Sequence, residues 1–325
     1  MAKARHLPPT HEEFIFPQFM RLLLLLCLLP LCSCALSTKE SPSPQAPTNS
    51  FFTTSDGKQL PLRHWNLKAQ PKTVLIGLHG IEGAARDFRN LGKTLPIQSP
   101  STSLYALNMR GAGYDPAPRS KGDILSPDLW KRDLHELHQT LKQRHPSARF
   151  IWIGESMGSL IALHTAAESS AKPDGLILVS PVVSLDAIPS WQVRMLRLAG
   201  WLAPGARVSL ESLAGGSFQA TTSSNHFDQS ETNPYHVERY TLRYLATLAK
   251  LSQSMSEQAQ EHTIPTLMLY GGKDHFTDDA QIQTFMNAFP KPPQVHKLDS
   301  SHHLLFYDKQ KVEVISTILK WSSEL

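Results

Sequence analysis

The sequence predicts an α/β protein in which a mostly parallel sheet carries helices on both of its faces. Short, nearly continuous apolar runs recur along the chain, as is typical of strands that are buried on both sides. Stretches with helical spacing of apolar residues separate these runs, which is the order of a parallel sheet with crossover helices. The chain has 325 residues, of which 41% are hydrophobic and 18% charged, so it can fold around a sizeable core.

The folded part is expected to span 51–325 and to contain eight strands. Two of them flank a turn at Asp56-Gly57. The other six are the apolar runs at 73–78, 104–109, 149–153, 175–179, 266–270 and 295–298. Helical spacing predicts helices at 84–94, 127–145, 159–168, 278–289 and 309–321. No internal repeat is present, so one domain around one sheet is the expected organisation.

Residues 182–262 interrupt this alternation of strands and helices. About 80 residues separate two expected strands here, and their apolar pattern is helical. An insertion of this length is usually a lid or a small helical cap. Within it, the apolar stripe from Trp191 to Leu202 is interpreted either as the lining of an acyl channel or as the packing face of a cap helix.

The N-terminal part of the chain is expected to lie outside the fold. From Met20, an Arg, a Leu-rich run and small residues follow one another in the order of a secretory signal peptide. The apolar run is shorter than the roughly 20 residues that span a bilayer. Residues 1–19 are polar and contain three prolines, so we expect translation to begin at Met20. Residues 1–33 are therefore assigned to the signal region.

A lipid anchor is predicted at Cys34. The stretch Leu31-Cys32-Ser33-Cys34 resembles the lipobox of bacterial lipoproteins, with an ordinary signal peptide or an uncleaved anchor as the alternatives. Residues 34–50 are rich in Ser, Pro and Thr and would form an extended tether. Ala35 resembles the residue found in lipoproteins that are sent to an outer membrane. We therefore expect membrane attachment in a bacterial cell envelope, at the outer membrane where one exists.

Composition excludes several other classes of function. The formal net charge is only +4 and no dense Lys/Arg run occurs, so no nucleic-acid partner is expected. All three cysteines fall between residues 27 and 34, so the folded part has no disulfide and no thiolate metal ligand. No metal-ligand cluster, dinucleotide fingerprint or phosphate loop is found, and no cofactor is expected.

Ser156 is the predicted nucleophile. It is the central residue of Gly154-Glu155-Ser156-Met157-Gly158, which matches the G-x-S-x-G nucleophile elbow. In such an elbow the serine sits on a strained turn between a strand and a helix. The flanking glycines are needed because side chains there would strike neighbouring segments. An apolar strand precedes the motif and a helical pattern follows it, which is the context that the elbow requires.

A serine hydroxyl needs a base to accept its proton and an acid to orient that base. In proteins with a G-x-S-x-G elbow, the acid follows the serine in the chain and the histidine follows the acid. Asp274 lies just past a predicted strand end and is the predicted acid. Asp278 and Asp279 are alternatives, but they fall at a helix start, where carboxylates commonly cap amides. The base is His302 or His303, since both follow the last strand.

Two main-chain N–H groups are expected to stabilise a developing oxyanion. One belongs to Met157, which follows the nucleophile at a helix N-terminus. The other is assigned to Ile81, in the turn Leu78-His79-Gly80-Ile81 after the first long buried strand. His79 is interpreted as a structural side chain that fixes the shape of this turn.

Taken together, the motifs resemble the α/β-hydrolase superfamily, in its monoglyceride lipase and lysophospholipase-like branch, the serine aminopeptidase-like hydrolase 4 group. The resemblance covers about 51–322 and rests on six features: the opening Thr54-Ser55-Asp56-Gly57 followed by Trp65, Leu78-His79-Gly80, Asn108-Met109-Arg110-Gly111-Ala112-Gly113, the elbow, Gly271-Gly272-Lys273-Asp274 and His302-His303-Leu304-Leu305-Phe306. It implies an eight-stranded sheet with a helical cap inserted after the sixth strand. The closing motif of the family runs His, any residue, two aliphatics and an aromatic, a register that selects His302 as the base.

The sequence departs from the family pattern in one turn. Asn108 stands where the family usually has Asp, and Tyr114-Asp115 replaces the usual Ser. Because this turn is structural support, the departure does not put the chemistry in doubt. The insertion 182–262 shows no match to the family, so the resemblance implies the reaction class better than the substrate.

The predicted function is hydrolysis of a carboxylic ester through an acyl-enzyme, with a lysophospholipid, a monoacylglycerol or a small acyl ester as substrate. An acyltransferase that uses the same acyl-enzyme is the first alternative. A binding or assembly role without catalysis is the second, although the presence of Ser156, Asp274 and His302 weakens it. Peptidase activity is a minor further option.

Overall fold

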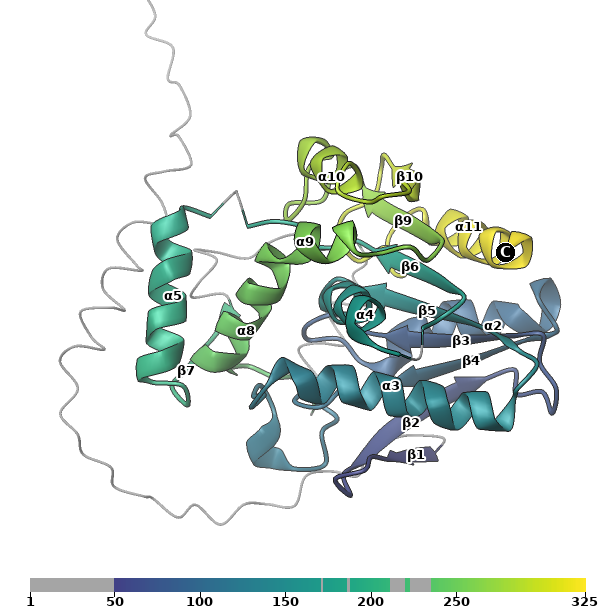
Figure 1. The fold of residues 1–325 in the computed structure, drawn as a ribbon, viewed down its shortest axis with the longest axis horizontal. Coiled ribbons are helices and arrows are strands. Elements are labelled where there is room, and N and C mark those ends of the chain that lie inside the picture. Colours follow the sequence, from purple (N-terminus) through teal and green to yellow (C-terminus); the bar gives the residue numbers. More distant parts are fainter. Residues whose placement is uncertain (1–49, 171, 186–187, 211–219, 223–234) are drawn as a thin grey trace, which may run out of the picture.

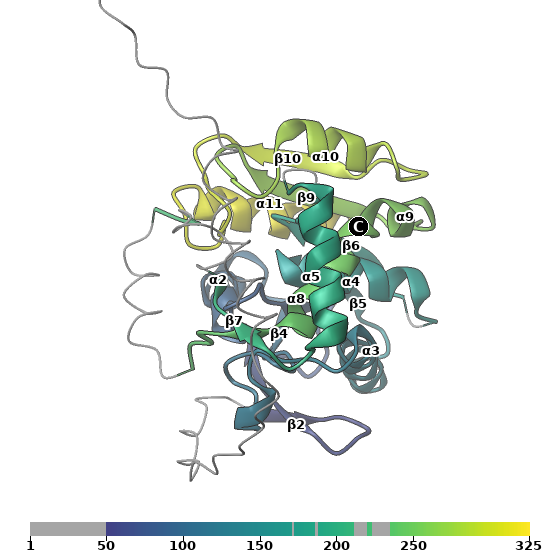
Figure 2. The ribbon, with the colours of Figure 1, turned by 90° about the vertical axis from the view of Figure 1, so that its left-hand side faces the viewer.

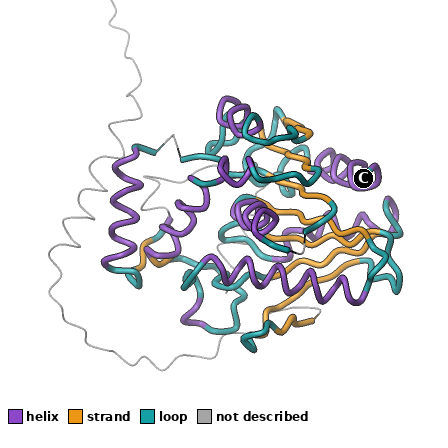
Figure 3. Tube along the Cα trace, in the orientation of Figure 1, coloured by secondary structure: helices purple, strands orange, loops and turns teal. Residues whose placement is uncertain are grey.

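The computed structural model describes residues 50–170, 172–185, 188–210, 220–222 and 235–325, and it confirms the predicted α/β architecture (Figures 1 and 3). Eight strands form one sheet in the order β1-β2-β4-β3-β5-β6-β9-β10. Their bounds are β1 Ser50–Thr53, β2 Gln59–Trp65, β3 Thr73–Leu78, β4 Thr102–Leu107, β5 Arg149–Glu155, β6 Gly175–Val179, β9 Thr266–Gly271 and β10 Gln294–Leu298. The ladders β1–β2 and β2–β4 are antiparallel, and the other five are parallel.

Helices cover both faces of the sheet, and each face has its own hydrophobic core (Figure 1). On one face lie α3 (Pro127–Arg144), α4 (Met157–Glu168) and α10 (Asp279–Met286). On the other face lie α2 (Arg89–Gln98) and α11 (Lys311–Glu324). Because the central strands are buried from both sides, every residue of β3, β4 and β6 is inaccessible to solvent or nearly so.

The starts of two helices follow from their capping residues. Ser126 caps α3 by accepting a hydrogen bond from the amide of Asp128 at 3.2 Å, and Pro127 occupies the first helical position. Asp278 caps α10 in a capping box with Gln281. Both helices therefore begin close to where the sequence predicts them.

The helix predicted at 84–94 differs from the structure in both its bounds and its type. Instead of a helix over 84–94, a short 3₁₀ turn, η1 (Ala85–Phe88), leads into α2, which continues to Gln98. Pro96 lies inside α2 and removes one helical hydrogen bond. The helix continues because Leu91 and Leu95 are fully buried against the sheet, which outweighs the missing bond.

The insertion between β6 and β9 contains five described elements. They are α5 (Ser190–Leu202), the two-stranded ribbon of β7 (Arg207–Val208) and β8 (Tyr240–Thr241), α8 (Leu242–Gln253) and α9 (Met255–Gln260). Residues of α8 and α9 join the core around α4, whereas α5 is the outermost of these elements, in front of α8 in the side view (Figures 1 and 2). The described part of the insertion is thus mainly helical, and some of it belongs to the main core.

The apolar stripe of α5 points largely away from the protein. Trp201 is 77% exposed and Leu202 is 65% exposed, while Val193 and Gly200 form the buried side of the helix. Gly200 faces α8, where an added Cβ would lie 2.8 Å from the Cβ of Ala246. Neither interpretation of the stripe, channel lining or packing face, fits Trp201 and Leu202.

The predicted signal region 1–33, the lipidation site Cys34 and most of the tether lie outside the described residues. Among the residues that the structure describes, no helix combines the length and the apolar character needed to cross a bilayer.

Candidate active site

Ser156 occupies a strained bend between β5 and α4. Its backbone has φ 51° and ψ −114°, a left-handed conformation that costs a non-glycine residue about 1–3 kcal/mol. The bend is fixed by the amide of Ser156, which donates to the carbonyl of Val179 at 2.8 Å. A Cβ on Gly154 would lie 2.4 Å from the backbone of Gly158, and one on Gly158 would lie 2.1 Å from the carbonyl oxygen of Leu78. Both glycines are therefore required by close backbone approach, as the sequence predicts.

His303 joins Ser156 to Asp274 through two hydrogen bonds. Its Nε2 lies 2.8 Å from the hydroxyl oxygen of Ser156, and its Nδ1 lies 2.7 Å from a carboxylate oxygen of Asp274. The carbonyl of His303 accepts a bond from the hydroxyl of Ser180 at 2.6 Å, and its ring packs against Phe276. Ser156, His303 and the carboxylate of Asp274 are all buried, so these bonds are shielded from water.

The selection of His302 as the base is wrong in this structure. The Nδ1 of His302 lies 3.0 Å from Asp308, and the main-chain amide of His302 donates to the same carboxylate oxygen at 2.6 Å. The imidazole that bonds to Ser156 belongs to His303. The family register therefore selects the base one residue too early. It does not take into account that the ring of His302 has its own carboxylate partner, Asp308, six residues further along the chain.

The structure places the three candidate acids in different environments. Asp274 contacts His303, and its other carboxylate oxygen accepts the amide of Phe276 at 2.8 Å. Asp278 caps α10, and Asp279 forms an ion pair of 2.7 Å with Lys297. Only Asp274 of the three is bonded to the imidazole beside Ser156, which agrees with its selection from the sequence.

His79 holds the turn after β3, as the sequence analysis proposes. Its Nδ1 lies 2.7 Å from the carbonyl of Gly80, and its Nε2 accepts the amide of Met109 at 3.1 Å. Both ring nitrogens are thus used in a neutral tautomer with the proton on Nδ1. Complete burial of the ring lowers the pKa of His79, which keeps this tautomer at neutral pH.

Two more side chains fix the rest of this turn. The amide of Ala84 donates to Asp87 at 2.7 Å, and the amide of Ala85 donates to the side-chain oxygen of Asn108 at 2.9 Å. The side-chain nitrogen of Asn108 donates to the carbonyl of Pro61 at 3.1 Å. An aspartate in place of Asn108 would lack this donor, so the departure from the family pattern suits the local bonding.

The turn passes close to the nucleophile. A Cβ built on Gly80 would lie 3.3 Å from the Cβ of Ser156 and 3.9 Å from its hydroxyl oxygen. Ile81 is the next residue of this turn, and Met157 is the first residue of α4, where amides have no helical partner. This arrangement agrees with Ile81 and Met157 as oxyanion donors, an assignment that stays a prediction.

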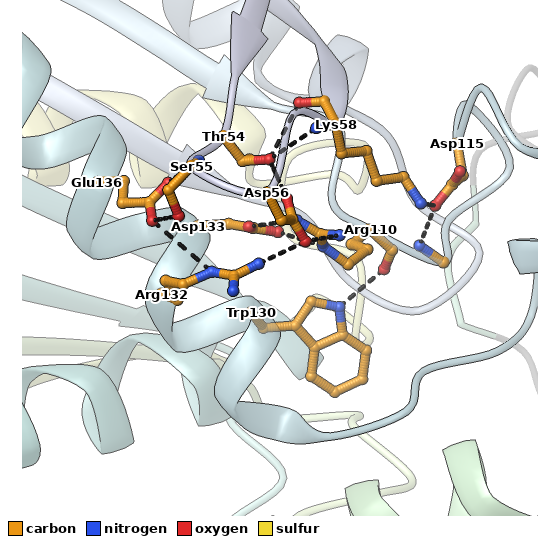
Figure 4. Close-up of polar contacts among 11 residues, drawn as sticks. Thr54, Ser55, Asp56, Lys58, Arg110, Asp115, Trp130, Arg132, Asp133 and Glu136 are labelled. Atoms are coloured by element: carbon orange, nitrogen blue, oxygen red, sulfur yellow. Dashed lines mark hydrogen bonds and ion pairs between the residues drawn. The ribbon is translucent and has the colours of Figure 1, made fainter.

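The turn after β4 is braced from outside the site, as Figure 4 shows. Arg110 makes two hydrogen bonds to Asp133, of 2.9 and 2.8 Å, and an ion pair of 3.0 Å with Asp56. The donors to Asp56 itself, first Arg110 and then Thr54, hold the pKa of this carboxyl group well below its usual value. Asp115 accepts the amide of Gly111 at 2.8 Å, where the backbone has φ 80°. The whole cluster ties the turn to α3 and to the β1–β2 hairpin, which is a structural task.

Glu155 is a buried carboxyl group that the sequence analysis does not single out. It precedes the nucleophile, is 1% exposed, and one of its oxygens has no hydrogen-bond partner. Burial, and next the nearby charge of Asp87, raise the pKa of Glu155 well above its usual value. Its environment therefore favours the protonated, neutral carboxyl group. Its only sequence signal is a glutamate at the end of the apolar strand β5.

Across the described residues, no group of three or more His, Cys, Asp or Glu side chains is arranged to hold a metal ion.

Comparison with known proteins identifies the family of this chain. Residues 69–310 match the model of the Hydrolase_4 family, described as serine aminopeptidase, S33. Monoglyceride lipase of Rattus norvegicus is 22% identical over 274 residues, covering 82% of this chain and 86% of the relative. Monoacylglycerol lipase of Mycolicibacterium smegmatis is 22% identical over 259 residues, covering 79% and 90%.

Among solved structures, a soluble variant of monoglyceride lipase from Saccharomyces cerevisiae, in complex with a substrate analog, has a similar fold. It aligns with a TM-score of 0.70 and 16% identity, covering 87% of this chain and 97% of that one. The family match extends from the segment before β3 to the end of the loop that carries His303 and Asp308. The chain therefore belongs to the Hydrolase_4 (serine aminopeptidase, S33) family and has the α/β-hydrolase fold.

Proposed function

We propose that this protein is a serine hydrolase of carboxylic esters, with Ser156 as nucleophile, His303 as general base and Asp274 as the acid that orients it. One observation carries the proposal: two consecutive hydrogen bonds, of 2.7 and 2.8 Å, connect Asp274 through His303 to the hydroxyl of Ser156. These residues are far apart in sequence, and three separate loops bring them together in a buried site. Nucleophile, base and orienting acid in this order are the requirement of acyl transfer to serine.

The geometry supports a reaction in two steps. Asp274 holds the proton on Nδ1 of His303, so Nε2 is free to accept the proton of the Ser156 hydroxyl as its oxygen attacks the ester carbonyl. The amides of Met157 and Ile81 are proposed to bind the resulting oxyanion. His303 then returns the proton to the departing alcohol, which leaves an acyl-enzyme. A water molecule, deprotonated by the same Nε2, releases the acid and restores Ser156.

The proposed substrates are acyl lipids with one exposed ester, such as a monoacylglycerol or a lysophospholipid, or smaller acyl esters. Support comes from the relatives, several of which carry the name monoglyceride lipase or monoacylglycerol lipase. Further support comes from α5, whose outer side exposes Leu198, Trp201 and Leu202. A tryptophan and leucines on one side of a surface helix suit contact with a lipid interface.

Attachment to a membrane through a lipid on Cys34 is part of the same proposal. Its support is the signal-like region from Met20, the lipobox-like residues before Cys34 and the Ser/Pro-rich tether that follows. We propose a location in a bacterial cell envelope, at the outer membrane where one exists. Mass spectrometry of the mature N-terminus tests this, because a diacylglyceryl-modified Cys34 as first residue is expected and an unmodified residue would contradict it.

The activity is tested by hydrolysis of p-nitrophenyl esters and of monoacylglycerols over a series of acyl-chain lengths. The wild type is expected to release the free acid, and Ser156→Ala is expected to lose this activity. The matched control is Ser316→Ala, which removes a hydroxyl from an exposed position of α11 and should behave as the wild type. Parallel reactions with added alcohols or amines separate hydrolysis from acyl transfer. Equal rates for the wild type and Ser156→Ala would contradict the proposal.

A further inference from the structure

Asp308 connects three parts of the protein around the base. One of its carboxylate oxygens accepts the main-chain amide of His302 at 2.6 Å and the Nδ1 of that residue at 3.0 Å. The other oxygen accepts the amide of Lys309 at 2.9 Å and the amide and hydroxyl of Thr222. Asp308 is 2% exposed, and its side chain is fully buried. A carboxylate with this many donors is a fixed structural centre.

The partner Thr222 belongs to the insertion, in the described segment 220–222. This segment makes a second bond to the same loop, because the carbonyl of Ala220 accepts the amide of Leu304 at 2.9 Å. The two bonds fall on either side of the base: Leu304 follows His303 directly, and His302, which Asp308 holds, precedes it. The insertion is thus bonded to both neighbours of the base, once directly and once through Asp308.

The opposite side of the loop is held by the sheet. The amide of Lys273 donates to the carbonyl of Ser301 at 2.9 Å, and the hydroxyl of Ser180 donates to the carbonyl of His303. A Cβ on Gly271 would lie 2.4 Å from the carbonyl oxygens of Ser301 and His302, so the loop packs directly on the end of β9. The sheet fixes one side of the loop, and Asp308 with segment 220–222 fixes the other.

We propose that Asp308 is a positioning residue for His303 and that it transmits the placement of the insertion segment 220–222 to the base. The proposal rests on the function proposed above, because it assumes that His303 acts on Ser156. It assigns a task to the imidazole–carboxylate pair of His302 and Asp308, which lies beside the reacting groups and does not take part in proton transfer. A substrate that shifts the insertion would, through Asp308, also shift the base.

The electrostatics support this role. Burial opposes the charge of Asp308, yet the donors from Thr222, His302 and Lys309 lower its pKa to about 2. The carboxylate is therefore charged at working pH, and each of the hydrogen bonds described above comes from an N–H or O–H donor. Charge-assisted bonds of this kind are about twice as strong as neutral ones, so Asp308 connects segment 220–222 firmly to the loop that carries His302 and His303.

Asn at position 308 cannot replace this carboxylate. Each oxygen of Asp308 accepts at least one main-chain N–H, from His302 on one side and from Lys309 on the other. In Asp308→Asn one of these amides must face the NH₂ group of the new side chain, whichever way that group is turned. The loop then has to shift although the side-chain volume is unchanged. A misplacement of about 1 Å at a reacting group costs about a hundredfold in rate, which is the loss of kcat that we expect.

Thr222 allows a test from the side of the insertion. Thr222→Val keeps the shape and removes the hydroxyl, and we expect kcat on p-nitrophenyl acetate to fall about tenfold with KM nearly unchanged, as for a lost charge-assisted bond. Thr222→Ser should restore the rate. The double variant Thr222→Val with Asp308→Asn should be no slower than Asp308→Asn alone, because the hydroxyl then has no carboxylate to hold. Thr284→Val, the same exchange at an exposed position of α10, is the matched control.

The experiment combines these rates with amide hydrogen exchange of the peptide 300–309. Faster exchange and lower kcat in Thr222→Val, with neither change in Thr284→Val, is the expected result. Wild-type rates and wild-type exchange in folded Thr222→Val and Asp308→Asn would overturn the inference. If the wild type itself hydrolyses no ester, the proposed function fails. In that case hydrogen exchange alone decides. Wild-type exchange of the 300–309 peptide in the variants refutes the connection through Asp308, and faster exchange retains it as a structural connection between segment 220–222 and the loop.

Discussion

The adjacent residues His302 and His303 allow a direct test of which histidine is the base, because substitution by asparagine should abolish activity at position 303 and leave it nearly unchanged at position 302. The side-chain NH₂ of an asparagine can take the place of Nδ1, so His303→Asn keeps a donor for Asp274 and His302→Asn keeps a donor for Asp308. Neither variant retains Nε2. Only in His303 does Nε2 contact the hydroxyl of Ser156, at 2.8 Å. His303→Asn therefore removes the base and leaves the rest of the local bonding in place.

The size of the effect follows from the role of the base. Loss of the base in a serine triad lowers kcat by about 10⁴–10⁶, which corresponds to about 5–8 kcal/mol of transition-state stabilisation. His302→Asn should stay within about threefold of the wild type, since the main-chain bond from residue 302 to Asp308 remains.

The assay is the initial rate of p-nitrophenyl butyrate hydrolysis, with circular dichroism to verify that each variant is folded. A folded His303→Asn with near-wild-type activity, or a His302→Asn that loses a thousandfold or more, would refute the assignment of the base.

Three further predictions concern stability. Because the pKa of Glu155 is raised in the folded state, unfolding releases a proton as the pH rises above about 4.5, so this group makes stability fall with rising pH, by at most about 1.4 kcal/mol per pH unit. Glu155→Gln should reduce the slope of stability against pH in urea unfolding above pH 5, and identical slopes would count against this prediction. Burial lowers the pKa of His138 to about 4, and its Nδ1 accepts the indole N–H of Trp152 at 3.0 Å. Stability should therefore fall on acidification from pH 6.5 to 4, because protonation of His138 favours the unfolded state. A His138→Asn variant that loses as much stability as the wild type over this pH range would argue against this. Gly158→Ala should destabilise the protein by about 1–3 kcal/mol and lower activity, because the new Cβ would lie 2.1 Å from the carbonyl oxygen of Leu78. A thermal midpoint equal to that of the wild type would show that the elbow can accommodate a side chain at this position.

Much of the fold could be predicted because its signals are local. The strands β3, β5 and β6 are buried on both faces, and this produces apolar runs that are visible without any partner. The elbow at Ser156 could be predicted because the space that Gly154 and Gly158 need depends on the adjacent strand and helix alone.

The choice of the base could not be predicted in the same way. His302 and His303 are distinguished by their carboxylate partners, and the partner of His302 is Asp308, which becomes close only when the loop folds back. The same holds for Glu155, whose burial and proximity to the charge of Asp87 arise only in the folded chain. It also holds for the outward face of α5, since periodicity shows that an apolar stripe exists but not what lies opposite to it.

The central claim is that Ser156 is activated by His303 in a working acyl-transfer site. Reaction with a fluorophosphonate, followed by tandem mass spectrometry, tests it most directly, because the reagent needs an activated serine and marks the one that reacts. We predict a single adduct on Ser156 in the wild type, none in Ser156→Ala, and a reaction at least about a thousandfold slower in His303→Asn. An adduct on another residue, or equal labelling of Ser156→Ala, would contradict the account.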